Sequence, residues 1–261
     1  MKPSRSVLVV ALVLTALLIS GARSSAFALD PGYVALGDSI EAGFGASSPD
    51  KRWVSLFRSY LIGKLGPATE LVNLGIPGAT VRDIQQEQLV PALVAIATHS
   101  PVVVSWGGGG NDLLDFIASP QAATCLHGNV SCLTRLNALL NNIQQTIDVT
   151  VKALREAAGP DTKILLRTQY NPFLPARCDP SGTQAALAAV VLEGEAPPFL
   201  TSGLNDRIRD VAVKYSARVI DVYQVFALKA NDPSDDYIAA DCIHPDDLGH
   251  KAISDAAQFA F

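Results

Sequence analysis

Short apolar runs recur along the chain and alternate with longer segments that have helical spacing. Each run is bounded by turn-forming residues, which is typical of a buried strand. The runs are Tyr33–Leu36, Glu70–Leu74, Val102–Trp106, Lys163–Leu166 and Arg218–Val222. Buried strands that alternate with helices predict a parallel sheet covered on both faces. The expected fold class is therefore α/β, with a five-stranded sheet.

Helical periodicity is clearest from Leu133 to Ala157, where leucine, isoleucine and valine return every three or four residues. A last helix is expected from about Pro245 to about Phe259, because proline suits a first helical position. The stretch Ser181–Pro198 is rich in alanine, valine and glycine and is expected to be irregular. Residues 29–261 contain no internal repeat or low-complexity linker, and their number suits one large domain.

The first 28 residues have the pattern of a secretion signal. Lys2 and Arg5 precede an apolar run, Val7–Ile19, and small residues follow from Ser20 to Ala28. Alanines at positions 26 and 28 form an AxA site, which predicts cleavage after Ala28. A retained membrane anchor is the alternative, although the uncharged run is short for a bilayer span. No later stretch is long and apolar enough to cross a membrane, so we expect a soluble, exported mature protein.

Composition and charge exclude several classes of protein. Hydrophobic residues make up 49% of the chain and charged residues 17%, which rules out a disordered tail, a coiled coil or a collagen-like repeat. The formal charge at pH 7 is −5, and it becomes −8 without the signal, which carries three basic residues and no acidic one. Because nucleic-acid affinity depends on clustered lysine and arginine, this sign argues against nucleic acid as a partner.

The cysteines are even in number and lack CxxC spacing. In the oxidising compartment of an exported protein, two disulfides are favoured over a metal site. Cys125, Cys132, Cys178 and Cys242 allow three pairings. We favour Cys125 with Cys132 as a local link and Cys178 with Cys242 as a long-range one, and free buried thiols are the alternative.

Glycine-bearing or polar blocks follow four of the five strands. Ligands of an open parallel sheet bind beyond the carboxyl ends of its strands, so these blocks are the candidates for chemistry. They read GDSI at Gly37–Ile40, NLGIPGAT at Asn73–Thr80, GGGGND at Gly107–Asp112 and DCIH at Asp241–His244. The glycines of the third block are not followed by Lys and Ser or Thr, so a phosphate-binding loop is excluded.

These blocks contain the components of nucleophilic catalysis. Ser39 lies on a tight turn at a strand exit, and a serine nucleophile needs a base. His244 is the candidate base, and Asp241 can reach its imidazole within one turn and hold its tautomer. Gly78 permits close approach of the backbone, and Asn111 offers a side-chain amide, so both can help to bind an anion. Taken singly, the serine and the asparagine are more often helix caps and the glycine a turn residue.

Together, in this order, the four blocks resemble those of the GDSL family of serine hydrolases, also called SGNH hydrolases. The resemblance spans Gly37 to His244, with Ile40 in place of the usual leucine. It implies a three-layer α/β/α fold and ester hydrolysis, without a metal or organic cofactor. It also implies Ser39 as nucleophile, His244 as base, Asp241 as its orienting partner, and an oxyanion hole formed by the Ser39 amide, Gly78 and Asn111. The absence of a GxSxG motif argues against the commoner α/β-hydrolase layout.

Other interpretations stay open at this point. A metal site would use four acidic and histidine side chains near the C-terminus, namely Asp241, His244, Asp246 and His250. The other histidines, His99 and His127, are expected on the surface. A third possibility is an exported protein that binds lipid or glycan without turnover.

The fold and the triad do not determine the substrate class, because lipases, other esterases and carbohydrate deacetylases share this fold. We favour small or medium-chain carboxylic esters. Apolar residues in Ala185–Leu192 and Ala196–Leu200 could line an acyl groove or belong to the core.

Overall fold

A parallel sheet forms the centre of the computed structural model, which describes residues 29–194, 200, 202–230, 232 and 236–261. The expected secretion signal, with its cleavage site, lies outside the described residues. Five strands are hydrogen-bonded in the order β2-β1-β3-β4-β5, and all pairs are parallel. Their bounds are β1 Gly32–Leu36, β2 Glu70–Asn73, β3 Val102–Gly107, β4 Lys163–Arg167 and β5 Arg218–Ile220. The five strands expected from the apolar runs are confirmed, with ends shifted by one or two residues.

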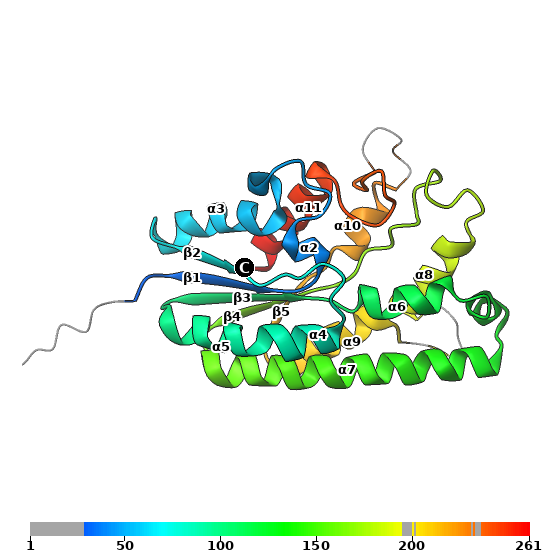
Figure 1. The fold of residues 1–261 in the computed structure, drawn as a ribbon, viewed down its shortest axis with the longest axis horizontal. Coiled ribbons are helices and arrows are strands. Elements are labelled where there is room, and N and C mark those ends of the chain that lie inside the picture. The colour runs from blue at the N-terminus through cyan, green and yellow to red at the C-terminus, as the bar shows by residue number, and fades with distance from the viewer. Residues whose placement is uncertain (1–28, 195–199, 201, 231, 233–235) are drawn as a thin grey trace, which may run out of the picture.

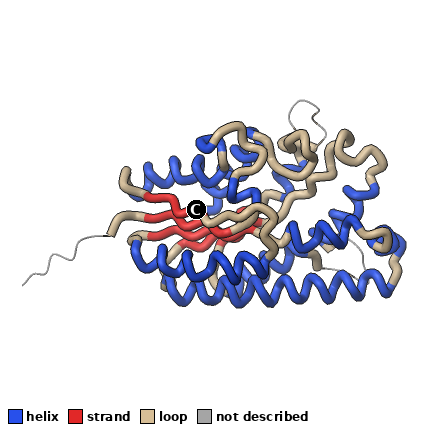
Figure 2. Tube along the Cα trace, in the orientation of Figure 1, coloured by secondary structure: helices blue, strands red, loops and turns tan. Residues whose placement is uncertain are grey.

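Helices cover both faces of the sheet, so the fold is the expected three-layer α/β/α sandwich (Figure 1; Figure 2). One face carries α2 Ser39–Ala42, α3 Trp53–Leu65, α10 Tyr223–Ala227 and α11 Asp247–Ala260. The other carries α4 Val81–Asp83, α5 Leu89–Thr98, α6 Gly110–Ala118, α7 Val130–Ala158, α8 Thr183–Glu193 and α9 Leu204–Lys214. Short helical turns complete the set at Pro49–Lys51, Ile84–Gln88 and Ala122–His127.

Strand β1 shows how the sheet divides the core into two layers. Tyr33 and Ala35 point toward α3 and α11, whereas Val34 and Leu36 join the cluster formed with α5, α7 and α9. All four side chains are fully buried. This alternation follows from the two-residue period of a strand, and burial on both faces explains why the run is continuously apolar.

Helix boundaries differ from the sequence-based expectations in three places. Helix α7 begins at Val130, three residues before the expected start, because Asn129 caps it by accepting a hydrogen bond from Cys132 N (3.0 Å). Helix α11 begins after Asp246, which is its cap, so Pro245 lies outside it. The expectation of an irregular stretch at Ser181–Pro198 is wrong for α8, and residues 195–198 lie outside the described residues.

Two disulfides link Cys125 to Cys132 and Cys178 to Cys242, which are the pairings favoured from the sequence. His127 is exposed as expected, but His99 is not: its side chain is only 11% exposed. The His99 imidazole packs where a side chain on Gly32 would lie and bonds Ala95 O through Nδ1 (2.7 Å). Among the described residues, no helix combines the length and apolar character needed to cross a bilayer.

Candidate active site

Ser39 is the first residue of α2, in the turn that follows β1. Asp38 caps this helix, because its carboxylate accepts a hydrogen bond from Ile40 N (2.9 Å) and its own amide donates to the Glu41 side chain (3.2 Å). The first N–H groups of a helix have no partner within the helix, so the Ser39 amide is not consumed by α2. A side chain at position 37 would collide with Glu41, which explains the glycine at Gly37.

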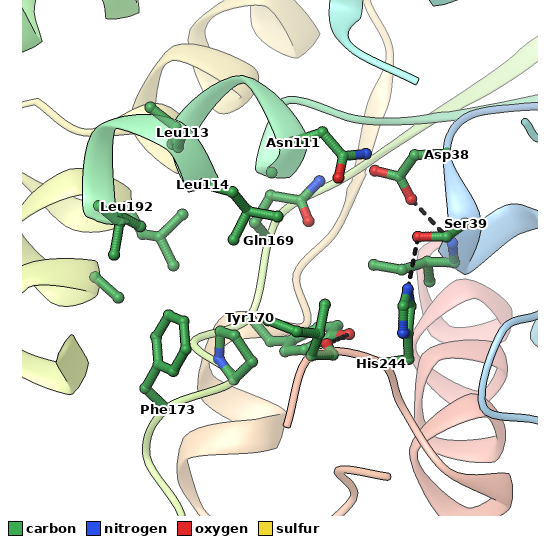
Figure 3. A pocket seen from close by; sticks show the side chains of 16 residues that line it. Asp38, Ser39, Asn111, Leu113, Leu114, Gln169, Tyr170, Phe173, Leu192 and His244 are labelled. Atoms are coloured by element: carbon green, nitrogen blue, oxygen red, sulfur yellow. Dashed lines mark hydrogen bonds between the residues drawn. The ribbon is translucent and has the colours of Figure 1, made fainter. Parts of the chain in front are cut away.

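Ser39, His244 and Asp241 form one chain of hydrogen bonds. The Ser39 hydroxyl lies 2.9 Å from His244 Nε2, and His244 Nδ1 lies 2.6 Å from Asp241 Oδ2 (the first contact is dashed in Figure 3). A carboxylate can only accept, so Nδ1 carries the hydrogen and Nε2 is left to accept from the serine hydroxyl. The structure therefore brings the three residues predicted from the sequence into one line.

The Asp241 carboxylate also shapes the turn that presents the histidine. Its Oδ1 accepts hydrogen bonds from the backbone amides of Ile243 and His244, both at 3.0 Å. Partial burial works against the charged form, but these amides and the imidazole outweigh it and lower the pKa of Asp241 below its usual value. Asp241 is thus held ionised next to His244, where it can stabilise an imidazolium.

The loop that carries the histidine is fastened to the segment that follows β4. The Tyr170 hydroxyl donates to Ile243 O (2.7 Å), and the Cys178–Cys242 disulfide joins the two segments covalently. The Arg177 guanidinium lies 3.4 Å from the sulfur atoms of both cysteines. Although Cys178 and Cys242 are 64 residues apart in sequence, they therefore form one support for the histidine.

Asn111 lies on α6 and faces the same cavity as Ser39 (Figure 3). Its amide Nδ2 donates to Ala79 O (3.0 Å), and the next residue, Asp112, accepts from Val81 N (3.0 Å). The GGGGND block thereby holds the loop formed by the NLGIPGAT block. The helix-cap interpretation of Asn111 is wrong, because the cap is the glycine two residues earlier. Gly78 has a left-handed backbone (φ 79°) in that loop but is not among the residues that line the cavity.

A buried ion pair lies behind Ser39, and the sequence did not predict it. Arg167, the last residue of β4, donates from Nε to Glu41 Oε1 (2.8 Å) and from Nη2 to Glu41 Oε2 (3.1 Å). Both side chains are 0% exposed. Gln88 adds a second fixed point, since its amide bonds both the N–H (2.8 Å) and the carbonyl (2.7 Å) of Gly37. These contacts join β4 and the segment before α5 to the turn that carries Ser39.

Asp38 introduces a second carboxylate into this buried region. Burial, and then the neighbouring Glu41 carboxylate, raise the pKa of Asp38 to about 7, although Arg167 works in the opposite direction. Burial by itself would lower the pKa of Arg167, but Glu41 and Asp38 raise it above the usual value. The guanidinium therefore stays charged, and the raised pKa of Asp38 lies close to neutral pH.

A cavity opens from Ser39 and His244 and runs between α6 and α8 (Figure 3). The empty space inside it is about 570 Å³, a figure that includes the part open to solvent. Most lining side chains are apolar: Ile40, Leu113, Leu114, Ile117, Tyr170, Pro172, Phe173, Ala188, Leu192 and Ile243. The polar ones are Asp38, Ser39, Asn111, Gln169 and His244.

The four side chains of the alternative metal site do not form one cluster, although Asp241 and His244 are in contact. His250 is fully buried and bonds Trp53 N through Nδ1 (3.3 Å) and Phe44 O through Nε2 (2.8 Å). Asp246 caps α11, and the imidazole of His244 is engaged in the triad. In the part of the chain that the structure describes, no three His, Cys, Asp or Glu side chains are grouped as a metal site.

A serine, a histidine and a carboxylate in hydrogen-bonded series, at the carboxyl edge of a parallel sheet, form the arrangement used by serine hydrolases. Residues 35–252 match the GDSL-like lipase/acylhydrolase family, and the chain belongs to that family. No match was found among curated proteins.

Solved structures with the same fold include several esterases. A lipase from a goat rumen metagenome is 20% identical, with 88% of this chain and 96% of that chain covered and a TM-score of 0.64. The psychrotrophic esterase EstA from Pseudoalteromonas is 16% identical over 88% of this chain and 96% of its own (TM-score 0.55). An acetyl xylan esterase variant from Geobacillus stearothermophilus is 17% identical, with 89% of this chain and 94% of that chain covered and a TM-score of 0.55. At these identities the likeness concerns the fold.

Proposed function

We propose that the protein is an exported serine hydrolase that cleaves carboxylic esters through an acyl-enzyme on Ser39. The observation that carries the proposal is the continuous series from the Ser39 hydroxyl through the His244 imidazole to the Asp241 carboxylate. Membership of the GDSL-like lipase/acylhydrolase family supports the same reaction class.

The reaction has two steps. As Ser39 Oγ bonds to the ester carbonyl carbon, His244 Nε2 takes the hydroxyl proton, and Asp241 stabilises the imidazolium. The bond from carbon to the alcohol oxygen then breaks, and the imidazolium gives its proton to the departing alcohol. Water repeats the sequence on the acyl-enzyme, releasing the carboxylic acid and restoring Ser39.

The oxyanion formed in each step needs hydrogen-bond donors. We assign this role to the backbone amide of Ser39, the backbone amide of Gly78 and the side-chain amide of Asn111. One hydrogen of Asn111 Nδ2 is used by Ala79 O, which leaves the second for the oxyanion. The bond to Ala79 also orients the amide before substrate arrives, and preorganised donors stabilise the transition state without further reordering.

The proposal includes export of the protein from the cytoplasm. Residues 1–28 have the pattern of a signal cleaved after Ala28, and residues 29–261 would then form a single hydrolase domain. The two disulfides support an oxidising compartment, since such bonds are rare where thiols are kept reduced.

The test compares the purified protein with a Ser39→Ala variant. The protein should hydrolyse p-nitrophenyl acetate with a burst of nitrophenol, resist chelators, and be labelled on Ser39 by a fluorophosphonate. Ser39→Ala should fold normally, because only one hydroxyl is removed. Its turnover should fall by a factor on the order of 10⁴, because that hydroxyl is the attacking group. Turnover within a few fold of the unaltered protein would exclude Ser39 as the nucleophile. Loss of activity to a chelator would favour the metal alternative, and binding of esters without turnover would favour a lipid- or glycan-binding protein.

A further inference from the structure

We propose that the cavity between α6 and α8 binds the acyl chain of the ester, and that this chain is apolar and longer than acetyl. The inference rests on the proposed function, because it assigns one part of the substrate to one side of Ser39. It goes further in choosing among ester classes, which the fold leaves open.

The walls of the cavity fit a hydrocarbon chain. Figure 3 shows Leu114 and Leu192 facing Tyr170 and Phe173 across the space that leads away from Ser39. None of the lining residues that the structure describes is lysine or arginine, so a charged chain would find no counter-ion there. Burial of each methylene against such walls is worth about 0.8 kcal/mol, so longer chains gain affinity while they stay inside the cavity.

The polar lining residues lie toward the Ser39 end and already have partners. The Gln169 amide donates to Gly108 O (2.7 Å) and accepts from Arg167 Nη1 (3.3 Å). Asp38 is committed to capping α2, and one hydrogen of the Asn111 amide to Ala79 O. A sugar placed between α6 and α8 would lose hydrogen bonds to water and find few replacements, which is costly for hydroxyl groups. The cavity therefore selects against a glycan in this position.

The geometry of the triad decides which half of the ester enters the cavity. The acyl carbon bonds to Ser39 Oγ, whereas the leaving oxygen must receive its proton from His244 Nε2. Beside His244 lies Phe44, with ring centroids 5.3 Å apart, and Phe44 is 50% exposed. The alcohol accordingly departs past Phe44 toward solvent, and the acyl chain occupies the enclosed side.

Ala188 controls how much of this space a chain can use. It lies on α8, is 1% exposed and lines the cavity, and α8 packs against α6. A larger side chain at this position would fill volume that the acyl chain needs. Ala186 on the same helix is exposed and does not line the cavity, so it provides a matched control.

The experiment measures kcat/KM for Ala188→Trp on two ester series. One keeps p-nitrophenol and compares hexanoate with acetate, and the other keeps acetate and compares hexyl with ethyl acetate in a pH-stat. In Ala188→Trp the hexanoate-to-acetate ratio should fall by roughly tenfold or more, because even one methylene in a fitted pocket is worth that much. The hexyl-to-ethyl ratio should keep its original value, and Ala186→Trp should preserve both ratios.

A second variant covers the possibility that tryptophan at 188 prevents folding. Leu114→Trp narrows the opposite wall from a partly exposed position, and it should lower the same hexanoate-to-acetate ratio. An unchanged ratio in a folded variant, or a change confined to the alcohol series, would overturn the acyl assignment. These outcomes differ from a failure of the proposed function, in which no ester hydrolysis would depend on Ser39 at all.

Discussion

Arg167 and Glu41 form a fully buried, bidentate ion pair directly behind the turn that carries Ser39. Burying two charges is costly and is repaid only when their geometry is good and their remaining polar atoms are bonded. Here the guanidinium also donates to Thr168 O (3.2 Å), and Glu41 Oε2 also accepts from Asp38 N. The pair therefore fixes α2, and with it Ser39, against the end of β4.

Removal of one charge from this pair should strongly destabilise the fold. Glu41→Gln leaves the Arg167 guanidinium buried without a full counter-charge, and losses of roughly 3–5 kcal/mol in the free energy of unfolding are typical of such changes. Urea unfolding gives the value directly. The matched control is Lys251→Gln, which breaks the exposed Lys251–Asp255 pair on α11 and should have a far smaller effect. Equal effects for the two variants would show that the buried pair does not hold the turn.

The raised pKa of Asp38 predicts a pH-dependent effect of Asp38→Asn. Burial and Glu41 raise the pKa of the folded carboxyl to about 7, whereas the unfolded chain ionises near pH 4. Between these values the folded state binds more protons than the unfolded state, so the contribution of Asp38 to stability falls as pH rises from about 4 to about 7. Asparagine removes this ionisation and can still cap α2.

Asp38→Asn should therefore gain stability, relative to the unaltered protein, as pH increases from about 4 to about 7, and the gain should then level off. Urea unfolding of both proteins across this range provides the measurement. The comparison cancels other titrating groups, including His250, whose pKa is lowered by burial and whose effect on stability has the opposite sign. A difference between the two proteins that is independent of pH would contradict the raised pKa.

Local patterns were sufficient to predict the strands and to select Ser39, His244 and Asp241, which the structure places in one hydrogen-bonded series. Contacts between residues far apart in the sequence were not predicted. A continuous apolar run predicts strand β1. Asp241 and His244 are only three residues apart, so their contact could be predicted from one turn of the chain. Glu41 and Arg167 are 126 residues apart, and charged residues are rarely buried, so nothing local marks them as partners. The only available signal was an arginine that directly follows the apolar residues of β4.

Helix α8 was missed for a different reason. Its buried residues include Leu187, Ala188, Val190, Val191 and Leu192, so it lacks the polar face that makes helical periodicity recognisable. Glycines at both caps, Gly182 and Gly194, add to the appearance of a loop. Helix α8 is therefore explained by packing on several sides rather than by an amphipathic pattern. It also supplies Ala188 and Leu192 to the cavity next to Ser39.

Asn111→Ala should separate catalysis from stability. If the Asn111 amide binds the oxyanion, turnover should fall by roughly 10²–10³. Because Asn111 does not cap α6, loss of its bond to Ala79 O should cost only about 1 kcal/mol of stability. Asn129→Ala provides the control: it removes a genuine cap, that of α7, and should lower stability by about 1 kcal/mol while the rate is maintained. Unchanged turnover in Asn111→Ala would exclude the oxyanion role.

Removal of the Cys178–Cys242 disulfide should affect both stability and rate. Closing a loop of 64 residues restricts the unfolded chain by about 4 kcal/mol in the entropy model, against about 2 kcal/mol for the seven-residue Cys125–Cys132 loop. Cys242 also lies between Asp241 and His244, so its loss should loosen the geometry on which proton transfer depends. The double variant Cys178→Ala, Cys242→Ala should therefore melt at lower temperature and turn over more slowly.

The Cys125–Cys132 disulfide is the control for the effect of the Cys178–Cys242 disulfide on turnover. It joins the short helical turn Ala122–His127 to the start of α7, so Cys125→Ala with Cys132→Ala should disturb mainly local order and leave most of the turnover. Melting curves and kcat for the two double variants, together with peptide mapping of the unreduced protein, decide the matter. Cys178 joined to Cys125 or Cys132, or four free thiols, would remove the support assigned to the histidine loop. Equal losses of turnover in the two double variants would show that the disulfide beside His244 has no special role in positioning it.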